Sequence, residues 1–469
     1  MLMRTPITNG NDSRLSFWLR VREFAVPPTM IETATARRLA GDWAGACAAA
    51  GFDVDIDLLA LTRSHGRETA ARVRDDLRRL APELLRWHMP RCAPDGLLRP
   101  GLTIALARYG PPGTRNGRGR TGSVSLVART APAWADAGQR VGLALWDGSH
   151  AGTDPHPHPH PHPRPDRRFR LDLHRHLWDA RRADELRIRC GAERSVADAS
   201  AVPDLPARVR AGCAVGRWVA EAQILLRAEG RETGPLRVRF GGRREMVLEP
   251  AAADDGSATL RTAAAYPNGR VSALPVLPDA ATWALPDLAL LRSGAIAPGR
   301  LHPLVASALI PGWSPADPPR STDRSDRAHL VACRGEQHRI GLIGGVLAAL
   351  DHDPAEIRRE ELLAALTGTP LPCLQAIDRA HRHPDCLAGV RERLDHGDIA
   401  GALAVVEGLL GPDAVLRDGP LRDELEASAR QRITYGMFRA GSAGAGPTRP
   451  QPARGRRNRR AHPRHATSR

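Results

Sequence analysis

Apolar residues in the N-terminal part of the chain recur at helical spacing. The segment 66–91 places Val73, Leu77, Leu80, Leu84 and Trp87 three or four residues apart, which aligns them as one stripe on a helix. A proline at position 82 predicts a kink within this helix. The pattern therefore predicts a helical region with one face turned toward a core.

The residues before this stripe predict three further helices. One covers 13–26 and ends at the pair Pro27-Pro28, and two more within 29–51 are joined at Gly41. Asp42 is well placed as the N-cap of the second of these two helices, because aspartate accepts hydrogen bonds from free N–H groups.

The rhythm changes after Pro90. Short apolar segments bounded by glycine and proline at 101–110, 122–130 and 140–148 predict three strands of an antiparallel sheet. The segments 235–242 and 244–250 predict a β-hairpin, and a strand entering a helix is expected over 169–191, followed by a helix over 205–230.

The last third of the chain again predicts helices. Asp353, Pro354 and Glu356 form a clear helix start as N-cap, first residue and third residue. Further helices fit 370–383, 385–396, 398–410 and 420–436. One short motif occurs twice, because 39–51 and 394–411 share Gly-Asp-x-Ala-Gly-Ala.

These elements predict a multi-domain α+β protein. We expect helical modules at both ends of the folded part, a β-rich and a mixed α/β module between them, and a disordered basic tail. The expected boundaries are a flexible N-terminus 1–12, a helical module 13–91, a small antiparallel β module 92–148 with a Gly/Arg loop 110–122, a His/Pro-rich linker 149–167, a mixed α/β module 168–325, a mainly helical module 326–439 and a disordered Arg-rich tail 440–469.

Composition excludes several chemistries. All 68 basic residues are arginine, so a P-loop, a protein kinase and a Schiff-base enzyme, each of which needs a lysine, are not expected in their usual form. The formal net charge is +16, but eight of the arginines lie in 440–469, which contains no acidic residue. The rest of the chain is only mildly basic, which is weak evidence for a polyanionic partner.

Cysteine usage and hydropathy favour a soluble cytoplasmic protein without a membrane partner. The seven cysteines form no C-x-x-C pair and are odd in number, which fits reduced thiols. The longest nearly apolar run, 341–350, is half of the ~20 residues that span a bilayer.

Two arginine-rich segments are candidates for nucleic-acid contact. The loop 110–122 contains a G-x-G-x-x-G string, but the strand that follows it argues against a dinucleotide site, which requires a helix there. A loop and a tail of this composition can bind phosphates without base specificity. The candidate residues are Arg115, Arg118, Arg120, Arg454, Arg456, Arg457, Arg459 and Arg460.

The segment 331–345 predicts an anion site. A short strand that turns at Gly335 into a helix would present free N–H groups, with Arg334, His338 and Arg339 beside them. Cys333 and His338 have the residue types of a nucleophile and a base, but the sequence offers no third group to orient them.

No metal site and no cofactor are expected. The set Cys373, His381, His383 and Cys386 has suitable ligand types for zinc, but its spacing lacks a paired-cysteine knuckle or an i, i+4 histidine pair. The four His-Pro pairs in 155–163 favour a polyproline spacer, in which neighbouring imidazoles point apart and cannot meet on one ion.

One further set is open. Asp53, Asp55 and Asp57 lie on one face if extended, where they could hold a cation or supply a nucleophile, or simply form the polar face of a strand.

No motif passes its structural context test, whereas amphipathic helices are plentiful. The sequence therefore favours a non-catalytic protein-interaction or accessory factor with an unknown protein partner. The alternatives are a sequence-nonspecific nucleic-acid-binding protein and an enzyme with an unfamiliar site.

Overall fold

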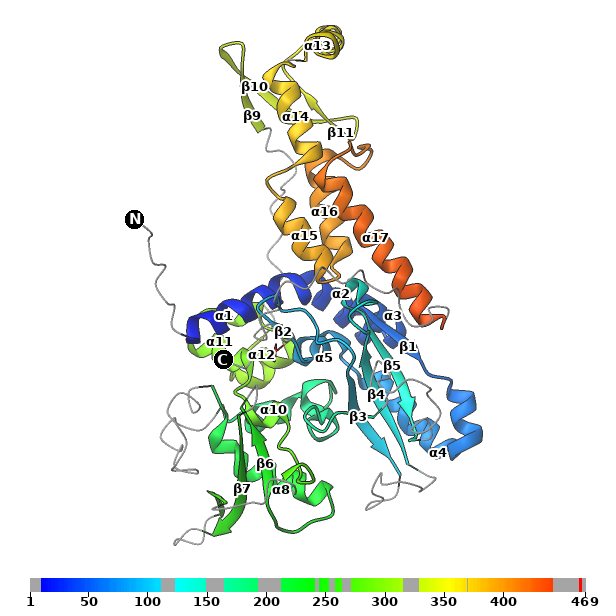
Figure 1. Ribbon diagram of the computed structural model, residues 1–469, viewed down its shortest axis with the longest axis vertical. Helices are drawn as coiled ribbons and strands as arrows, with labels where there is room; N and C mark the ends of the chain where they lie inside the picture. Colours follow the sequence, from blue (N-terminus) through cyan, green and yellow to red (C-terminus); the bar gives the residue numbers. More distant parts are fainter. Residues whose placement is uncertain are drawn as a thin grey trace, which may run out of the picture. The chain divides into compact units, whose positions relative to one another are not determined.

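A computed structural model describes residues 10–110, 123–148, 164–192, 212–240, 244–252, 258–263, 271–314, 329–368, 370–441 and 464–465. Contacts divide the chain into two units (Figure 1). The first comprises residues 1–316 together with 446–469, and the second comprises residues 317–445. Both contain helices and strands, so the predicted mixture of α and β structure is confirmed.

The N-terminal helices form where their caps and prolines predict. Asp42 accepts a hydrogen bond from the Gly45 amide and begins the third helix, as expected. Pro82 is the first residue of a separate helix and not a kink within one, because proline suits the first turn, where its missing N–H has no helical partner. The helical elements are α1 (Gly10–Arg20), a π-helical turn (Val21–Ala25), α2 (Pro28–Leu39), α3 (Trp43–Ala49), α4 (Leu58–Arg79, bent at Gly66) and α5 (Pro82–His88).

A four-stranded sheet lies at the centre of the first unit, in the order β1-β5-β4-β3. The three predicted antiparallel strands are confirmed as β3 (Thr103–Tyr109), β4 (Val124–Thr130) and β5 (Val141–Trp146). The fourth strand, β1 (Phe52–Asp55), comes from the segment between α3 and α4 and pairs parallel to β5. The helices before β1 and the three later strands therefore belong to one structure.

A second sheet in this unit is formed by the confirmed hairpin β6 (Leu236–Arg239) and β7 (Glu245–Ala252) with β8 (Ala258–Thr262). Helix α8 (Trp218–Ala228) packs on it, with Trp218 fully buried. The other short elements are α6 (Leu186–Arg189), α10 (Asp279–Thr282), α11 (Pro286–Arg292), α12 (Pro303–Leu309), β2 (Cys92–Ala93) and β12 (Arg464–His465).

One core joins regions that the sequence placed in separate modules. Its buried residues come from α4 and α5, from the central sheet, from the segment 169–186 and from α12. The predicted strand over 169–173 is wrong: this segment forms short 3-10 turns, held in part by the Trp178 indole N–H, which donates to the Leu171 carbonyl over 3.0 Å. Packing and a hydrogen bond between residues seven positions apart thus override the local preference for a strand.

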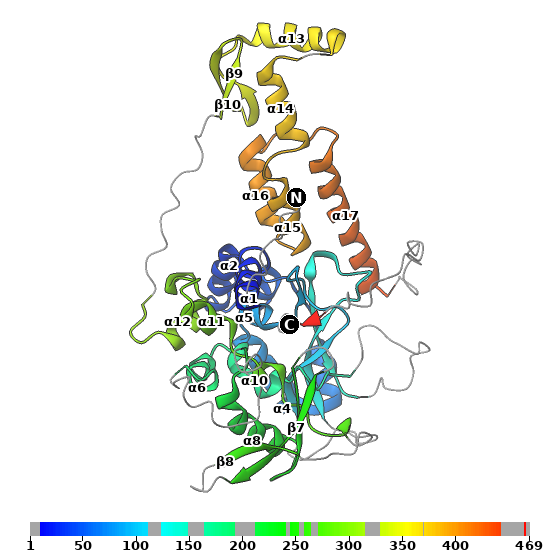
Figure 2. The ribbon, with the colours of Figure 1, turned by 60° about the vertical axis from the view of Figure 1, so that its left-hand side comes forward.

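The described residues of the second unit form a small sheet and five helices (Figures 1 and 2). The sheet order is β11-β10-β9, formed by β9 (His329–Cys333), β10 (Glu336–Ile343) and β11 (Val346–Ala349). The four helices expected after residue 370 are confirmed, and Asp353 caps the helix before them. The helices are α13 (Pro354–Thr367), α14 (Pro372–Arg382), α15 (Leu387–Asp395), α16 (Ile399–Leu410) and α17 (Pro420–Arg439).

The repeated Gly-Asp motif has the same structure in both units. Asp42 accepts from the Gly45 amide at 2.8 Å, and Asp398 accepts from the Gly401 amide at 3.0 Å. Each aspartate also pairs with an arginine five residues upstream, at 2.8 and 2.7 Å. The motif is thus a recurring helix-to-helix corner.

No helix in the described ranges has the length and apolar composition that a bilayer crossing requires. The loop 111–122, the His-Pro run, and the tail beyond residue 441 apart from residues 464–465, lie outside those ranges. The predictions made for these segments therefore concern residues that the structure does not describe.

Candidate metal centre

A two-residue turn places Cys333 at the end of β9. The two turn residues, Arg334 and Gly335, have φ angles of +54° and +89°, and Cys333 pairs with Glu336 across the hairpin. Positive φ at both central positions is typical of the type I′ turn, which matches the twist of the two strands. The predicted helix after Gly335 is therefore wrong, because this turn sends the chain back as β10.

Two other elements bring their side chains to Cys333. His352 lies in the turn between β11 and the cap of α13, and Cys373 is the second residue of α14, directly after Pro372. Both cysteines are buried, with exposed fractions of 1% and 0%, and the His352 side chain is 3% exposed. Three segments of the unit thus converge on one buried point.

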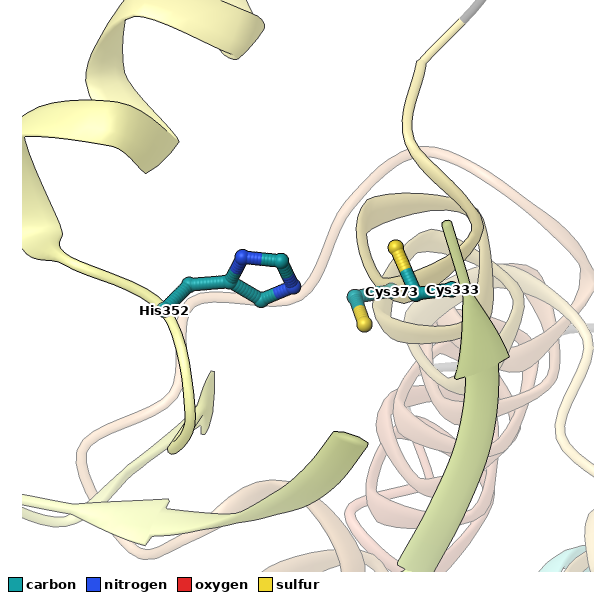
Figure 3. Close-up of side chains that lie close together, drawn as sticks. All are labelled: Cys333, His352 and Cys373. Carbon is teal, nitrogen blue, oxygen red and sulfur yellow. The ribbon is translucent and has the colours of Figure 1, made fainter. Parts of the chain in front are cut away.

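The three side chains have the separation and chemistry of metal ligands. One ligand atom from each lies within 4.8 Å of the other two, and the His352 ring faces the two sulfur atoms (Figure 3). In a tetrahedral zinc site with Zn–S near 2.3 Å and Zn–N near 2.0 Å, these atoms would be about 3.5–3.8 Å apart. Movements of at most about 1 Å would therefore bring these three atoms to the spacing of zinc ligands.

The His352 ring has a carboxylate on one side and no partner on the other. Its Nδ1 lies 3.5 Å from Glu356 Oε2, and its Nε2 is buried without a hydrogen-bond partner among the described residues. Metal-binding histidines commonly direct their second nitrogen toward a carboxylate, which leaves the first nitrogen free to bind the ion. Glu356 is suited to this supporting role.

A second imidazole lies against the first. The His338 ring stacks on His352 with centroids 4.3 Å apart and planes 12° from parallel. Its Nδ1 is also buried without a partner in the described part of the chain. His338 is therefore an additional nitrogen donor next to the cluster.

The Cys373 thiol is protonated at neutral pH in the absence of an ion. Burial, together with the hydrogen bond and charge of Cys333, raises the pKa of Cys373 to about 11. A buried thiol of this kind is a poor nucleophile at neutral pH, and a divalent cation would favour its ionisation.

Few buried apolar side chains stabilise this part of the second unit. Within the described residues of 329–382, the buried apolar side chains are Cys333, Ile340, Cys373 and Ile377, so two of four belong to the cluster.

Comparison of the chain with protein-family models, with curated proteins and with solved structures finds no match. The interpretation of the site as a metal centre therefore rests on its geometry.

Two of the residues predicted to bind an anion, Arg334 and Arg339, form ion pairs within the second unit. Arg334 pairs with Glu356 at 2.6 Å and with Glu360 at 2.5 Å, and Arg339 pairs with Asp351 at 2.7 Å. The helix start on which the anion prediction depended is absent from this hairpin. The four predicted residues, Arg334, Gly335, His338 and Arg339, therefore lie beside a cysteine-histidine cluster.

The other predicted sets are not brought together. Cys373 clusters with Cys333 and His352, and not with His381, His383 or Cys386, in the described part of the molecule. Asp53 pairs with Arg140 through two hydrogen bonds, and Asp57 caps α4. The candidate nucleic-acid residues at 115–120 and 454–460 lie outside the described ranges.

Sequence reasoning missed this cluster because its members are about 20 residues apart and no local spacing connects them. A usable signal does exist. Each residue lies where an element begins or ends, since Cys333 precedes an Arg-Gly turn, His352 precedes a helix cap and Cys373 follows a helix-starting proline. Ligands at such positions converge only when the elements pack together.

Proposed function

We propose that this chain is a non-catalytic interaction protein whose second unit folds around one zinc ion. The observation that carries the proposal is the buried cluster of Cys333, His352 and Cys373. Two thiolates and an imidazole form a soft donor set that suits zinc and disfavours magnesium or calcium.

A closed, structural site fits the surroundings better than an open one. Rotation of His338 would supply a fourth ligand, since its ring already stacks on His352. Structural zinc sites use four protein ligands, whereas catalytic sites keep a position for water. Small folded regions with few buried apolar residues commonly depend on a metal for their stability. The described residues of 329–382 bury only four apolar side chains.

Helix α13 is the proposed contact surface for a partner. None of its residues from Pro354 to Leu366 is buried, and its leucines at 362, 363 and 366 are 69%, 49% and 85% exposed. The ion pairs of Arg334 tie this helix to the hairpin that carries Cys333. The metal would therefore fix the position of an apolar helix face, which suits insertion into an apolar groove of another protein.

Site-specific photo-crosslinking in the native host tests this interaction. A photoreactive residue at Leu366 should give a discrete adduct with one partner protein, whereas the same residue at Glu361, on the opposite face of α13, should not. The adduct should also be lost in Cys373→Ser, which removes a ligand. Equal labelling from both faces, or no adduct at Leu366, would contradict the proposal.

The composition of the tail supports one alternative function. Residues 440–469 contain eight arginines and no acidic residue, which suits salt-sensitive contact with any nucleic acid. Filter binding of the full chain and of a variant without 440–469, at about 50 and about 300 mM salt, separates the alternatives. Binding that depends on the tail and weakens with salt would support the nucleic-acid function. Absence of such binding would reject this alternative.

A further inference from the structure

The first unit contains a cavity of about 90 Å³, and none of its lining residues belongs to the metal cluster. It is formed by α1, by the end of α5 and the residues that follow it, by the segment 169–177 and by the residues from α10 to the start of α11. Its wall includes the rings of Trp18, Phe169 and Trp283. A cavity that holds benzene measures about 150 Å³, so this one suits a smaller molecule.

Four side chains of the wall have a buried nitrogen atom without a hydrogen-bond partner among the described residues. These atoms are Arg14 Nε, Trp18 Nε1, His88 Nε2 and Arg91 Nε. The indole and guanidinium nitrogens can only donate hydrogen bonds. Each unsatisfied buried donor costs on the order of 1–3 kcal/mol, so one wall with three of them favours an acceptor-rich occupant.

The wall also contains positive charge without a counter-ion. The terminal nitrogens of Arg14 donate to the Gly212 and Ala284 carbonyls, both at 3.0 Å, and those of Arg91 donate to the Gly96 and Arg86 carbonyls. Neither guanidinium forms an ion pair with a carboxylate of the described residues. Burial lowers the pKa of both groups, which is the expected consequence of cations in a poorly solvated site.

Negative charge near the cavity is already matched. Asp279 lines the wall, and its carboxylate is bound by Arg168 at 2.9 Å. Asp287, close by on α11, pairs with Arg22 and accepts from the Trp87 indole. The charges of Arg14 and Arg91 therefore remain uncompensated around the cavity.

We propose that this cavity binds a small organic carboxylate of two to four carbon atoms. After small rotations that turn these buried nitrogen atoms toward the cavity, the carboxylate oxygens would accept from Arg14, Trp18 and Arg91, and the short alkyl part would lie against the aromatic wall. An inorganic phosphate has acceptor oxygens but no apolar part, so it would bind more weakly. This site is independent of the zinc cluster, and either proposal can fail without the other.

Titration of the full-length protein tests the site. Acetate, propionate, butyrate and inorganic phosphate are added at constant ionic strength, with binding followed by calorimetry and by tryptophan fluorescence. We expect saturable 1:1 binding of propionate or butyrate, at least fivefold tighter than phosphate. No saturable binding of any carboxylate, or a preference for phosphate, would overturn the proposal.

Variants separate the site from general anion attraction. Trp18→Phe keeps the ring and removes one donor, and should weaken propionate binding at least threefold; Arg14→Met should weaken it at least tenfold. Arg63→Met, at an exposed position on α4, is the matched charge control and should leave affinity unchanged. If Arg14→Met does not fold, Trp18→Phe decides alone, and unchanged affinity in that variant contradicts the assignment.

Discussion

Two buried histidines, one in each unit, differ in how their ring nitrogens are satisfied. In the first unit, His302 Nε2 lies 3.1 Å from Glu83 Oε1, and its Nδ1 accepts from the Leu304 amide. In the second unit, His352 Nε2 has no partner among the described residues but faces two thiols. A histidine with both nitrogens satisfied is explained by the fold, whereas one with a free nitrogen beside soft donors is a candidate ligand.

The surroundings of the two histidines differ in the same way. The core around His302 and Glu83 contains large buried side chains such as Leu84, Leu85 and Trp87. The segment around His352 buries few apolar groups. The comparison supports the proposal that a metal takes the place of apolar burial in the second unit. Four predictions test the two units, from the largest expected effect to the smallest.

Removal of zinc should have the largest effect and should be confined to the second unit. Structural zinc contributes on the order of 10 kcal/mol in small domains, so a chelator should abolish amide-exchange protection across β9 to α14. All nine tryptophans lie at or before position 313, so their fluorescence reports the first unit alone and should not change. A simultaneous loss of tryptophan signal would contradict the proposed independence of the two units.

Truncation of Glu83 should destabilise the first unit strongly. Glu83 is fully buried and contacts both His302 and Thr35, so Glu83→Ala leaves buried polar groups without partners. The expected loss is about 3–5 kcal/mol in urea unfolding followed by tryptophan fluorescence. Glu185→Ala is the control, because its pair with Arg182 is largely solvated and contributes little.

Acid should destabilise the first unit through Glu221. Burial would raise the pKa of this carboxyl, but the His174 imidazole 3.2 Å away and the hydrogen bonds from Arg189 outweigh burial and lower the pKa to about 2. Because this value lies below the ordinary one of 4.5, ionised Glu221 stabilises the fold above about pH 4.5. The stabilisation is lost as pH falls toward 2.

The size of this effect follows from the shift. It is at most about 3.5 kcal/mol, since the pKa shifts by about 2.5 units and one unit corresponds to about 1.4 kcal/mol. Urea unfolding by tryptophan fluorescence between pH 6 and about pH 3 measures it. Glu221→Gln should be less stable at pH 6 and should show a flatter pH dependence, and an unchanged slope in that variant would exclude this carboxyl as the cause.

The repeated corners should show the smallest effect. Asp398 is 7% exposed and caps α16, so Asp398→Ala should cost about 1 kcal/mol in the unfolding of the second unit, followed by circular dichroism. The equivalent Asp42→Ala should cost the first unit less, because the Asp42 side chain is 45% exposed. Equal losses at both corners would show that burial does not set the strength of this cap.

Local signals predicted much of the fold. The stripe that includes Val73 and Leu77, the caps at Asp42 and Asp353 and the three strands of the central sheet all follow from periodicity and cap chemistry. The parallel pairing of β1 with β5 could not be predicted, because it joins residues about 90 positions apart. The hairpin at Gly335 was mistaken for a helix start, because Arg334 adopts a positive φ that arginine seldom takes.

The candidate metal site was not predicted from the sequence. The segment around Cys333 and His338 stood out from the sequence for its charge and its turn, but its partners lie on other elements. From the sequence alone, Cys373 falls into one set with its neighbours His381 and Cys386. Sequence spacing does not show that the side chain of Cys373 instead meets those of Cys333 and His352. Tertiary packing, and not a motif, creates the donor set.

Metal content of the full-length protein tests the central claim most directly. The account predicts one zinc per chain after dialysis against a weak chelator, together with an intense thiolate-to-metal absorption band when cobalt replaces zinc. Cys373→Ser should lose both signals, whereas Cys386→Ser, a half-buried cysteine outside the cluster, should keep both. Deletion of 155–163 should also keep both. Zinc that persists in Cys373→Ser, or that disappears with the His-Pro run, would contradict the account.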